Sequence, residues 1–272
     1  MKDRVSVEIN NHVADVRLNR VDKMNALDSS MFEAIIDAGQ ELANNPDVRC
    51  AVLSGNGRAF CSGIDTSRFN GDKKSQTMST GGVASLTERT HGVANRPQFA
   101  AWVWHELPVP VIAAVHGVAF GGGFQIMLGA DIRYIAPDTK LSIMEVKWGL
   151  VPDMCGTVLT KGLVRDDILR ELTYTGRIFS GTEAGAYGFA TQVCDNPLDR
   201  ALELAAEIAE KSPSAIEAAK RIYNQVKSVP DADGLILEAT EQQGLRGGHN
   251  QGEAVRSVID KRQAQFVSPR AS

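Results

Sequence analysis

The stretch GVAFGGGFQIM, from Gly117 to Met127, places three consecutive glycines between two apolar segments. The segment before it, Val111–Val115, is a continuous apolar run, which is typical of a strand buried on both faces. The segment that follows, Phe124–Ala130, is expected to be a helix. A strand that enters a helix through glycines leaves unpaired N–H groups at the positive end of the helix dipole. Such a turn can bind a phosphate or stabilise an oxyanion, although it has neither the GxGxxG pattern nor the Lys-Ser/Thr of a P-loop.

Outward from this stretch, the chain alternates between expected strands and helices up to about residue 195. Val5–Ile9 and Val13–Leu18 alternate apolar and polar residues around Asn10-Asn11, which predicts a β-hairpin. The other expected elements are a helix over Ser29–Asn44 capped by Ser29 or Ser30, a strand over Cys50–Leu53, a helix over Val93–Glu106, and strands over Ile132–Ile135 and Leu141–Met144. This alternation predicts an α/β fold with a parallel sheet.

After Pro197 the pattern becomes helical. Four helices are expected, over Leu198–Lys211, Pro213–Lys227, Ala232–Leu245 and Gln251–Phe266. We therefore divide the chain into an α/β core, residues 1–195, and a helical C-terminal region, residues 196–272. The apolar faces of these helices need a partner, which is either the core or another subunit.

The composition is typical of a soluble globular protein. The 272 residues are 43% hydrophobic and 23% charged, and the net charge of −4 gives no basic footprint for nucleic acid. The N-terminal MKDRVSVEIN lacks the apolar region of a secretory signal, and no apolar run approaches the length of a membrane span. The four cysteines are far apart and form no CxxC pair, which argues against disulfides and zinc. We expect a cytoplasmic protein without membrane or nucleic-acid partners and without a metal.

Two further stretches contain residues suited to chemistry. GRAFCSGIDTSRF, Gly57–Phe69, follows an expected strand and places Gly63 in a sharp turn. MEVKWGLVPDMCGT, Met144–Thr157, contains Glu145 and Asp153, eight residues apart. Carboxyl groups held in a cleft can remove and return protons as general bases and acids. Asp153 has a second interpretation, as a loop residue or the N-cap of a helix, because Asp is a favoured cap.

Together and in this order, these stretches resemble the crotonase superfamily, the enoyl-CoA hydratases and isomerases. NRVDKMNAL (19–27), TGRIFSGTEAGAYGFATQV (175–193), SPSAIEAAK and the terminal DKRQAQF extend the resemblance over essentially the whole chain. The resemblance implies a core of stacked β-β-α spiral turns and a helical C-terminal trimerisation region. It also implies an acyl-CoA thioester as substrate, no separate cofactor because CoA belongs to the substrate, and a homotrimer or a hexamer built as a dimer of trimers.

The resemblance assigns binding roles along two segments. The backbone amides of Ile64 and Gly122 would hold the thioester oxygen and stabilise the enolate that forms when a nearby proton leaves. The other implied substrate contacts are Lys23, Met24 and Ala26 at the adenine end of CoA, and Ser62, Gly63 and Asp65 around the first amide. A lysine that family members often carry is replaced here by Ser67, next to Arg68. The polar stretch Lys73–Gly82 is expected to be a surface loop, either a lid or a plain insertion.

The acidic positions depart from the hydratase pattern. Hydratases of the family carry two glutamates, whose positions here hold Gln125 and Glu145. Glutamine cannot exchange a proton, but its amide can orient water or substrate. The spacing E-V-x-x-G-L-x-x-D resembles the dienoyl-CoA isomerase branch, in which the matching Glu and Asp move protons between distant carbons. That branch usually carries Asp at the position of Gln125.

We therefore favour double-bond isomerisation by Glu145 with Asp153. The first alternative is hydration of 2-enoyl-CoA with Glu145, a lyase reaction. The second is a non-catalytic protein on the same scaffold that binds acyl-CoA or RNA. Other chemistry of the superfamily, such as thioester hydrolysis or dehalogenation, would need a nucleophile that the sequence does not offer. Trp148 is expected either to line the acyl pocket or to pack in the core.

Overall fold

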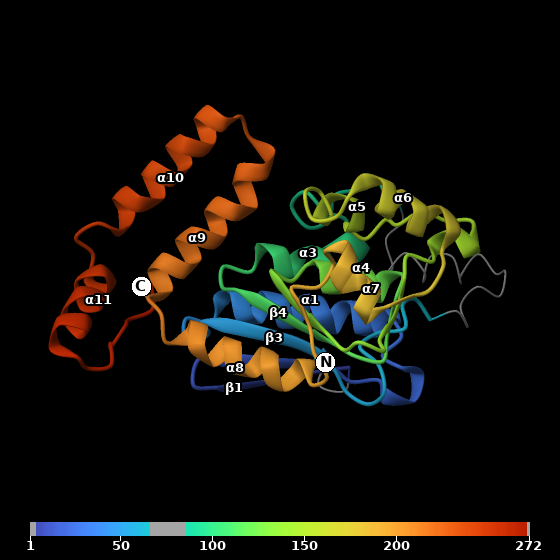
Figure 1. The fold of residues 1–272 in the computed structure, drawn as a ribbon, viewed down its shortest axis with the longest axis horizontal. Helices are drawn as coiled ribbons and strands as arrows, with labels where there is room; N and C mark the ends of the chain where they lie inside the picture. The colour runs from blue at the N-terminus through green and yellow to red at the C-terminus, as the bar shows by residue number, and fades with distance from the viewer. Residues whose placement is uncertain (1–3, 66–84, 271–272) are drawn as a thin grey trace.

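The computed structural model describes residues 4–65 and 85–270. Ser67, Arg68 and the predicted surface loop Lys73–Gly82 lie outside the described residues. Within the described part, the chain forms a six-stranded sheet, a three-stranded sheet and helices that cover both faces of the larger sheet. Figure 1 shows this body together with a pair of long helices that extend away from it.

The large sheet has the strand order β1-β2-β3-β4-β6-β9. Strands β1 (Val5–Asn10) and β2 (Val13–Leu18) form the predicted antiparallel hairpin, and the remaining neighbours pair in parallel. The two-residue turn is Asn11-His12, with φ of 48° and 69°, one residue later than expected. The other strands are β3 (Cys50–Gly55), β4 (Val111–Val115), β6 (Ile132–Ile135) and β9 (Gln192–Val193).

Alternate residues of the central strands enter two different cores. On one face, Leu53 and Ala113 pack with α1 (Ser29–Asn44), α3 (Arg96–Glu106) and α4 (Gly122–Leu128). On the other face, Val52 and Ile112 pack against α8 (Pro197–Ala209). Because side chains alternate across a strand, burial of both faces explains why these strands have continuous apolar sequences rather than alternating ones.

The small sheet has the order β5-β7-β8 and is built from strands that follow those of the large sheet. β4 continues into β5 (Val118–Phe120) and then α4, and β6 continues into β7 (Lys140–Ser142) and then the 3₁₀ helix η3 (Glu145–Trp148). β8 (Phe179–Ser180) completes the small sheet. These repeated strand–strand–helix turns are the β-β-α spiral that the resemblance implied.

One predicted cap and several predicted boundaries are wrong for identifiable reasons. Helix α1 has the predicted bounds, but it is capped by Asp28, whose side chain accepts from Met31 N at 2.7 Å, and not by either serine. Helix α3 starts at Arg96 rather than Val93, because Asn95 and Gln98 form a capping box there. The strand expected over Leu141–Met144 ends at Ser142, so Glu145 begins η3 instead of following a strand.

The remaining elements of the body are short. They are η1 (Val21–Lys23), α5 (Gly156–Leu159), α6 (Asp166–Thr175) and α7 (Gly181–Tyr187). The N-cap of α5 is Cys155, in the left-handed region with φ of 71°, so Asp153 does not cap this helix. The carboxyl group of Asp153 is therefore not used as a helix cap.

The helical C-terminal region is present, and its helices differ in what they contact. Helix α8 covers the large sheet, whereas α9 (Pro213–Gln225), α10 (Asp231–Leu245) and α11 (His249–Asp260) extend beyond the body after it (Figure 1). The short η4 (Val226–Ser228) joins α9 to α10. Helix α11 ends at Asp260 and not at Phe266, because Lys261 adopts a left-handed conformation.

One buried and one partly buried charged residue attach this region to the body. Lys220 of α9 donates to Asp131 Oδ2 at 2.8 Å and to the carbonyl of Val109 at 2.9 Å. Arg270, beyond α11, donates to Glu217 at 3.0 Å and to the carbonyl of Ala43 at 3.1 Å. The chain after α11 is thus folded back onto α1 and α9 rather than continuing as a helix.

Candidate active site

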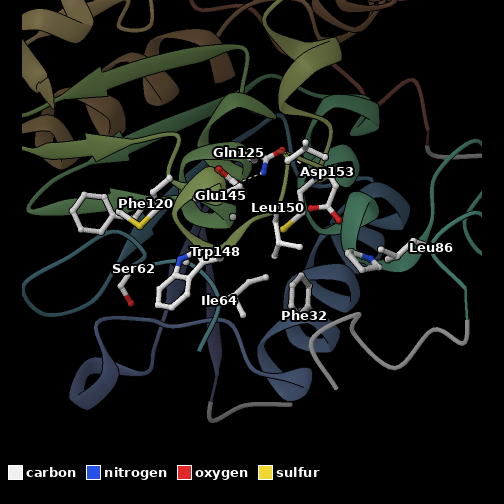
Figure 2. A pocket seen from close by; sticks show the side chains of 17 residues that line it. Phe32, Ser62, Ile64, Leu86, Phe120, Gln125, Glu145, Trp148, Leu150 and Asp153 are labelled. Carbon is white, nitrogen blue, oxygen red and sulfur yellow. Dashed lines mark hydrogen bonds between the residues drawn. The ribbon is translucent and has the colours of Figure 1, made fainter. Parts of the chain in front are cut away.

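A cavity of about 390 Å³ lies where the glycine stretch, the Gly63 turn and the segment after β7 meet. Figure 2 shows the side chains on its wall. The apolar part of the lining is made by Phe32, Leu86, Pro97, Phe120, Met144, Trp148, Leu150, Val151 and Met154. The polar part consists of Ser62, Gln125, Glu145 and Asp153, together with the backbone of Gly63, Ile64, Gly121 and Gly122. A mostly apolar cavity with a few converging polar groups is the usual form of a small-molecule site.

The segment 61–65 crosses this site between two other backbone segments. Cys61 N donates to the carbonyl of Val118 at 3.0 Å, whereas Asp65 N donates to the carbonyl of Leu27 on the opposite side at 3.2 Å. Successive amides of an extended segment point in opposite directions, so the amide of Ile64 points away from Leu27 and toward the glycine stretch. Gly63 has a φ of +85°, and a Cβ there would lie 2.6 Å from the carbonyl oxygen of Phe120. Only glycine fits this crossing.

The glycine stretch provides a second amide. Gly122 is the first residue of α4, so its N–H has no partner within the helix. The next residue, Gly123, is pressed against the Gly63 segment: a Cβ there would lie 2.4 Å from the carbonyl oxygen of Cys61. The structure therefore brings the amides of Ile64 and Gly122 to the wall of one cavity, as the resemblance implied for an oxyanion hole. Their role in binding a thioester oxygen stays a prediction.

Glu145 contributes one carboxyl group to this cavity. Its Oε1 accepts a hydrogen bond of 2.6 Å from Gln125 Nε2, and its buried Oε2 has no protein partner among the described residues. Burial raises the pKa of Glu145, the bond from Gln125 lowers it, and the charge of Asp153 raises it again. A carboxyl with a raised pKa in a closed pocket is a candidate proton acceptor and donor.

Asp153 contributes the second carboxyl. It lies in the irregular segment between η3 and α5, and its side chain opens into the same cavity (Figure 2). Desolvation by the surrounding protein raises the pKa of its carboxyl group as well, although the residue as a whole is exposed at the mouth of the cavity. The structure thus places Glu145 and Asp153 in one site, where both carboxyl groups have a pKa above the ordinary value.

Gln125 lies behind Glu145 and is almost completely buried, with 1% of its surface exposed. Its Oε1 accepts from Met154 N at 2.8 Å and from Gly156 N at 3.0 Å. The side chain therefore binds protein groups on both sides. Its predicted contact with substrate stays a prediction, and sequence reasoning missed these two backbone amides because no pattern of residue types encodes them.

The predicted CoA segment lies next to the cavity but not on its wall. Ser62 N donates to the carbonyl of Met24 at 2.9 Å, and Ser62 Oγ donates to the carbonyl of Lys23 at 3.2 Å. Ala26 is buried beside them, and Asp65 pairs with Arg20 Nη1 at 2.8 Å. The resemblance predicted the proximity of these segments, which we could not have derived from the residues alone.

One supporting residue, Asn25, was not singled out from the sequence. The buried Asn25 donates to the carbonyls of Asn56, Ala59 and Phe60, and so ties the CoA segment to the Gly63 segment. Its φ of 56° is a conformation that Asn tolerates better than most residues. Trp148 is half exposed and lines the cavity, which settles its place in favour of the pocket.

No cluster of three or more His, Cys, Asp or Glu side chains able to hold a metal ion occurs in residues 4–65 and 85–270. Over the same residues, no helix has the length and apolar character needed to span a bilayer.

Comparison with known proteins assigns this chain and its fold to a class. The Enoyl-CoA hydratase/isomerase family model matches residues 8–269, so the chain belongs to this family of enzymes. A crystal structure of enoyl-CoA hydratase from Bacillus anthracis has the same fold, with a TM-score of 0.87, 26% identity, and coverage of 97% of this chain and 99% of that one.

Two curated relatives have different named activities. The mitochondrial Delta(3,5)-Delta(2,4)-dienoyl-CoA isomerase of Mus musculus is 32% identical over 266 residues, which cover 94% of this chain and 79% of the relative. Carnitinyl-CoA dehydratase of Salmonella enteritidis is 32% identical over 238 residues, which cover 86% of this chain and 85% of the relative. These comparisons therefore establish the family. Whether the enzyme isomerises double bonds or adds or removes water must be argued from the residues of the site.

Proposed function

We propose that this enzyme isomerises double bonds in enoyl-CoA thioesters, with Glu145 and Asp153 as the proton-transferring groups. The observation that supports this most is the composition of the cavity wall. Two carboxyl groups with raised pKa values share the cavity, while the third polar position holds Gln125, which cannot exchange a proton. Isomerisation needs proton transfer at two carbons and no activated water.

The first step is removal of a proton from C2, next to the thioester carbonyl. The electrons of the C–H bond move into the carbonyl, and the oxygen becomes negative. The amides of Ile64 and Gly122 are the donors that would hold this oxygen. In a comparable oxyanion hole, loss of one donor costs about 3–4 kcal/mol of transition-state stabilisation.

The second step returns a proton farther along the chain. For a 3-enoyl thioester the proton returns to C4, and the double bond moves to C2–C3. For a 3,5-dienoyl thioester the proton returns to C6, and the conjugated 2,4-diene results. Glu145 lies beside the glycine turn, with Oε1 3.5 Å from where a Cβ of Gly121 would be, so we place it near C2. Asp153 would then serve the distant carbon C6, beyond the reach of Glu145.

Hydration of 2-enoyl-CoA is the second candidate, and the dehydratase relative supports it. Water addition requires one group to activate water and another to protonate C2. Glu145 could fill one of these roles and Asp153 the other. In this alternative Gln125 contributes no proton transfer, so the reaction would depart from the two-glutamate arrangement.

The test is a comparison of three substrates with one enzyme preparation. We expect conversion of 3-enoyl-CoA and 3,5-dienoyl-CoA, and little formation of 3-hydroxyacyl-CoA from 2-enoyl-CoA. Efficient production of the 3-hydroxyacyl ester would favour hydration instead. If no ester turned over but CoA esters bound, the protein would be a non-catalytic acyl-CoA binder.

Glu145→Gln is the matched control for the assignment of the base. The new amide keeps an acceptor for Gln125 Nε2, so the local structure should persist. We expect the rate to fall about 10²–10⁴-fold, the usual contribution of a general acid–base. Full turnover by this variant would show that Glu145 is not the central base.

We further propose that the extended C-terminal helices form a subunit interface. Leu235, Ile236, Val258 and Ile259 of α10 and α11 are apolar and each more than 60% exposed. Together they favour the expected homotrimer, or a hexamer of two trimers. Light scattering should give a trimeric or hexameric mass that Val258→Asp lowers, and a monomeric mass for the unaltered protein would refute the proposal.

Two further expectations concern a cofactor and the cellular location. No separate cofactor is required for this reaction, because proton transfer and the CoA group of the substrate suffice. The cytoplasmic location expected from the sequence stays a prediction, since relatives are named as mitochondrial and as peroxisomal.

A further inference from the structure

The side chain of Gln125 is held at both ends. Two backbone amides, of Met154 and Gly156, donate to its Oε1 at 2.8 and 3.0 Å. The amide group also packs flat against Gly156, where a Cβ would lie 2.8 Å from Oε1 and 3.0 Å from Cγ. Any other residue at position 156 would push Gln125 out of this place.

These contacts determine which end of the Gln125 amide faces Glu145. A flipped amide would set its NH₂ group against two N–H donors and leave those donors unpaired. The oxygen must therefore face Met154 and Gly156, and the NH₂ group must face Glu145. The bond of 2.6 Å between Gln125 Nε2 and Glu145 Oε1 is consequently a donor-to-carboxylate bond.

We propose that Gln125 is a positioning residue that fixes the carboxyl group of Glu145 beside the glycine turn by donating to Oε1, and that keeps it ready to accept a proton. This inference deepens the proposed function and rests on it for the identity of the substrate. Oε2 is enclosed and has no protein partner among the described residues. The bond from Gln125 to Oε1 is therefore the side-chain hydrogen bond that holds this carboxyl group in place.

The charges around Glu145 are consistent with this role. Helix α4 presents no titratable side chain, since its sequence is GGFQIML. From the segment after η3, Asp153 acts on Glu145 by raising its pKa, whereas the bond from Gln125 lowers it. Lys147 of η3 is exposed. Helix α6 packs against η3, and its charged residues Asp166 and Arg170 line a different cavity, on the other side of Gln125. Gln125 is thus the neighbour that favours the ionised form.

Two variants separate positioning of Glu145 from simple support of the chain. Gln125→Glu keeps an oxygen acceptor for Met154 N and Gly156 N but turns the donor to Glu145 into a second acceptor. Two carboxyl oxygens at this distance must share a proton, so Glu145 would become fully ionised only at higher pH. Gln125→Met has similar length and removes both the acceptor and the donor.

The expected outcome is a shift of the acid limb of kcat/KM to higher pH in both variants, with kcat reduced more than KM is changed. A purely supporting role predicts a different result: Gln125→Met would lose stability in denaturant titrations but would keep the pH profile of the unaltered enzyme. That result would overturn the inference. If Gln125→Met fails to fold, the titration of the Gln125 amide in the unaltered protein decides between the two.

A titration that needs no turnover keeps this test separate from that of the proposed function. In the unaltered protein, the side-chain amide resonance of Gln125 should move with pH together with the carboxyl resonance of Glu145. The movement should disappear in Glu145→Gln. A Gln125 resonance that is insensitive to pH would refute the positioning role even in an active isomerase. Coupled titration in a protein that converts none of the dienoyl or enoyl esters would instead refute the proposed function and leave the positioning of Glu145 intact.

Discussion

Replacement of Asp153 by asparagine should affect two isomerisations unequally. The variant keeps the size and polarity of the side chain but cannot exchange a proton. Conversion of a 3,5-dienoyl thioester requires protonation at C6, which we assign to Asp153. Conversion of a 3-enoyl thioester requires protonation at C4, close enough to C2 for Glu145 to serve both carbons.

The magnitude follows from these assignments. Loss of a general acid costs about 10²–10⁴ in rate, or about 2.7–5.4 kcal/mol in activation free energy. We expect this loss for the dienoyl substrate. For the 3-enoyl substrate we expect a change of less than about tenfold, because its proton-transferring group is untouched and the pocket wall keeps its shape.

The same substitution should change the pH dependence in a defined direction. The charge of Asp153 raises the pKa of Glu145, so its removal should lower that pKa and move the acid limb of 3-enoyl turnover to lower pH. Burial also raises the pKa of Asp153 itself, which means that the folded state disfavours the ionised carboxylate once the pH exceeds that pKa. Asp153→Asn removes this cost, and at neutral pH the variant should unfold at no lower temperature than the unaltered protein.

The assay follows both substrates with the same enzyme sample. Conjugation of the product diene changes the ultraviolet absorbance, and the 3-enoyl reaction can be followed by chromatography of the esters. Equal loss of both activities would show that Asp153 acts at C2 or supports the pocket generally. No loss with either substrate would remove Asp153 from the mechanism.

Further predictions concern the fold and the path of the proton. Lys220→Met breaks an ion pair with Asp131, in which the lysine side chain is 6% exposed and the aspartate side chain 26% exposed. We expect the free energy of unfolding to fall by about 3 kcal/mol in denaturant titrations, which is the lower end of the range for breaking a buried pair. Gly123→Ala should prevent stable folding because its Cβ would meet a backbone carbonyl, whereas Gly244→Ala in α10, with open space around it, should stabilise by about 0.5–1 kcal/mol. Deuterium at C2 of a 3-enoyl ester should appear partly at C4 by mass spectrometry, because one carboxyl group, that of Glu145, is assigned to both carbons; complete exchange with water would contradict this.

The elements of the fold could be predicted from the sequence wherever burial determined the pattern. Val111–Val115 and Ile132–Ile135 were predicted with their exact bounds, and Val111–Val115 is the continuous apolar run that is typical of a strand buried on both faces. The helix cap and the helix start that were predicted wrongly each depended on single hydrogen bonds. Asp28 caps α1 in place of the neighbouring serines, and Asn95 moves the start of α3 by three residues. Propensity does not distinguish between adjacent residues that are all able to cap a helix.

The stacking of the strands into a spiral came from the resemblance and not from periodicity. Residue patterns predicted a parallel sheet, but they did not predict that β5 and β7 would leave the large sheet and pair with each other. Three-residue strands have too little sequence for a pattern, and their pairing depends on contacts between distant segments. The same holds for the crossing of Gly63 over the glycine stretch, where Gly63 and Gly123 are each required by a backbone carbonyl more than fifty residues away.

The role of Gln125 could not be predicted from its residue type alone. From the sequence, Gln125 marked only the absence of a second acid. In the structure its oxygen accepts from the amides of Met154 and Gly156, and its NH₂ group donates to Glu145. Because a side-chain amide has one accepting end and one donating end, the backbone contacts alone decide the effect on the carboxylate. A glutamate at the same position would accept the same two amides but would compete with Glu145 for a proton, so this single position decides whether Glu145 receives a hydrogen bond or shares a proton with an adjacent acid.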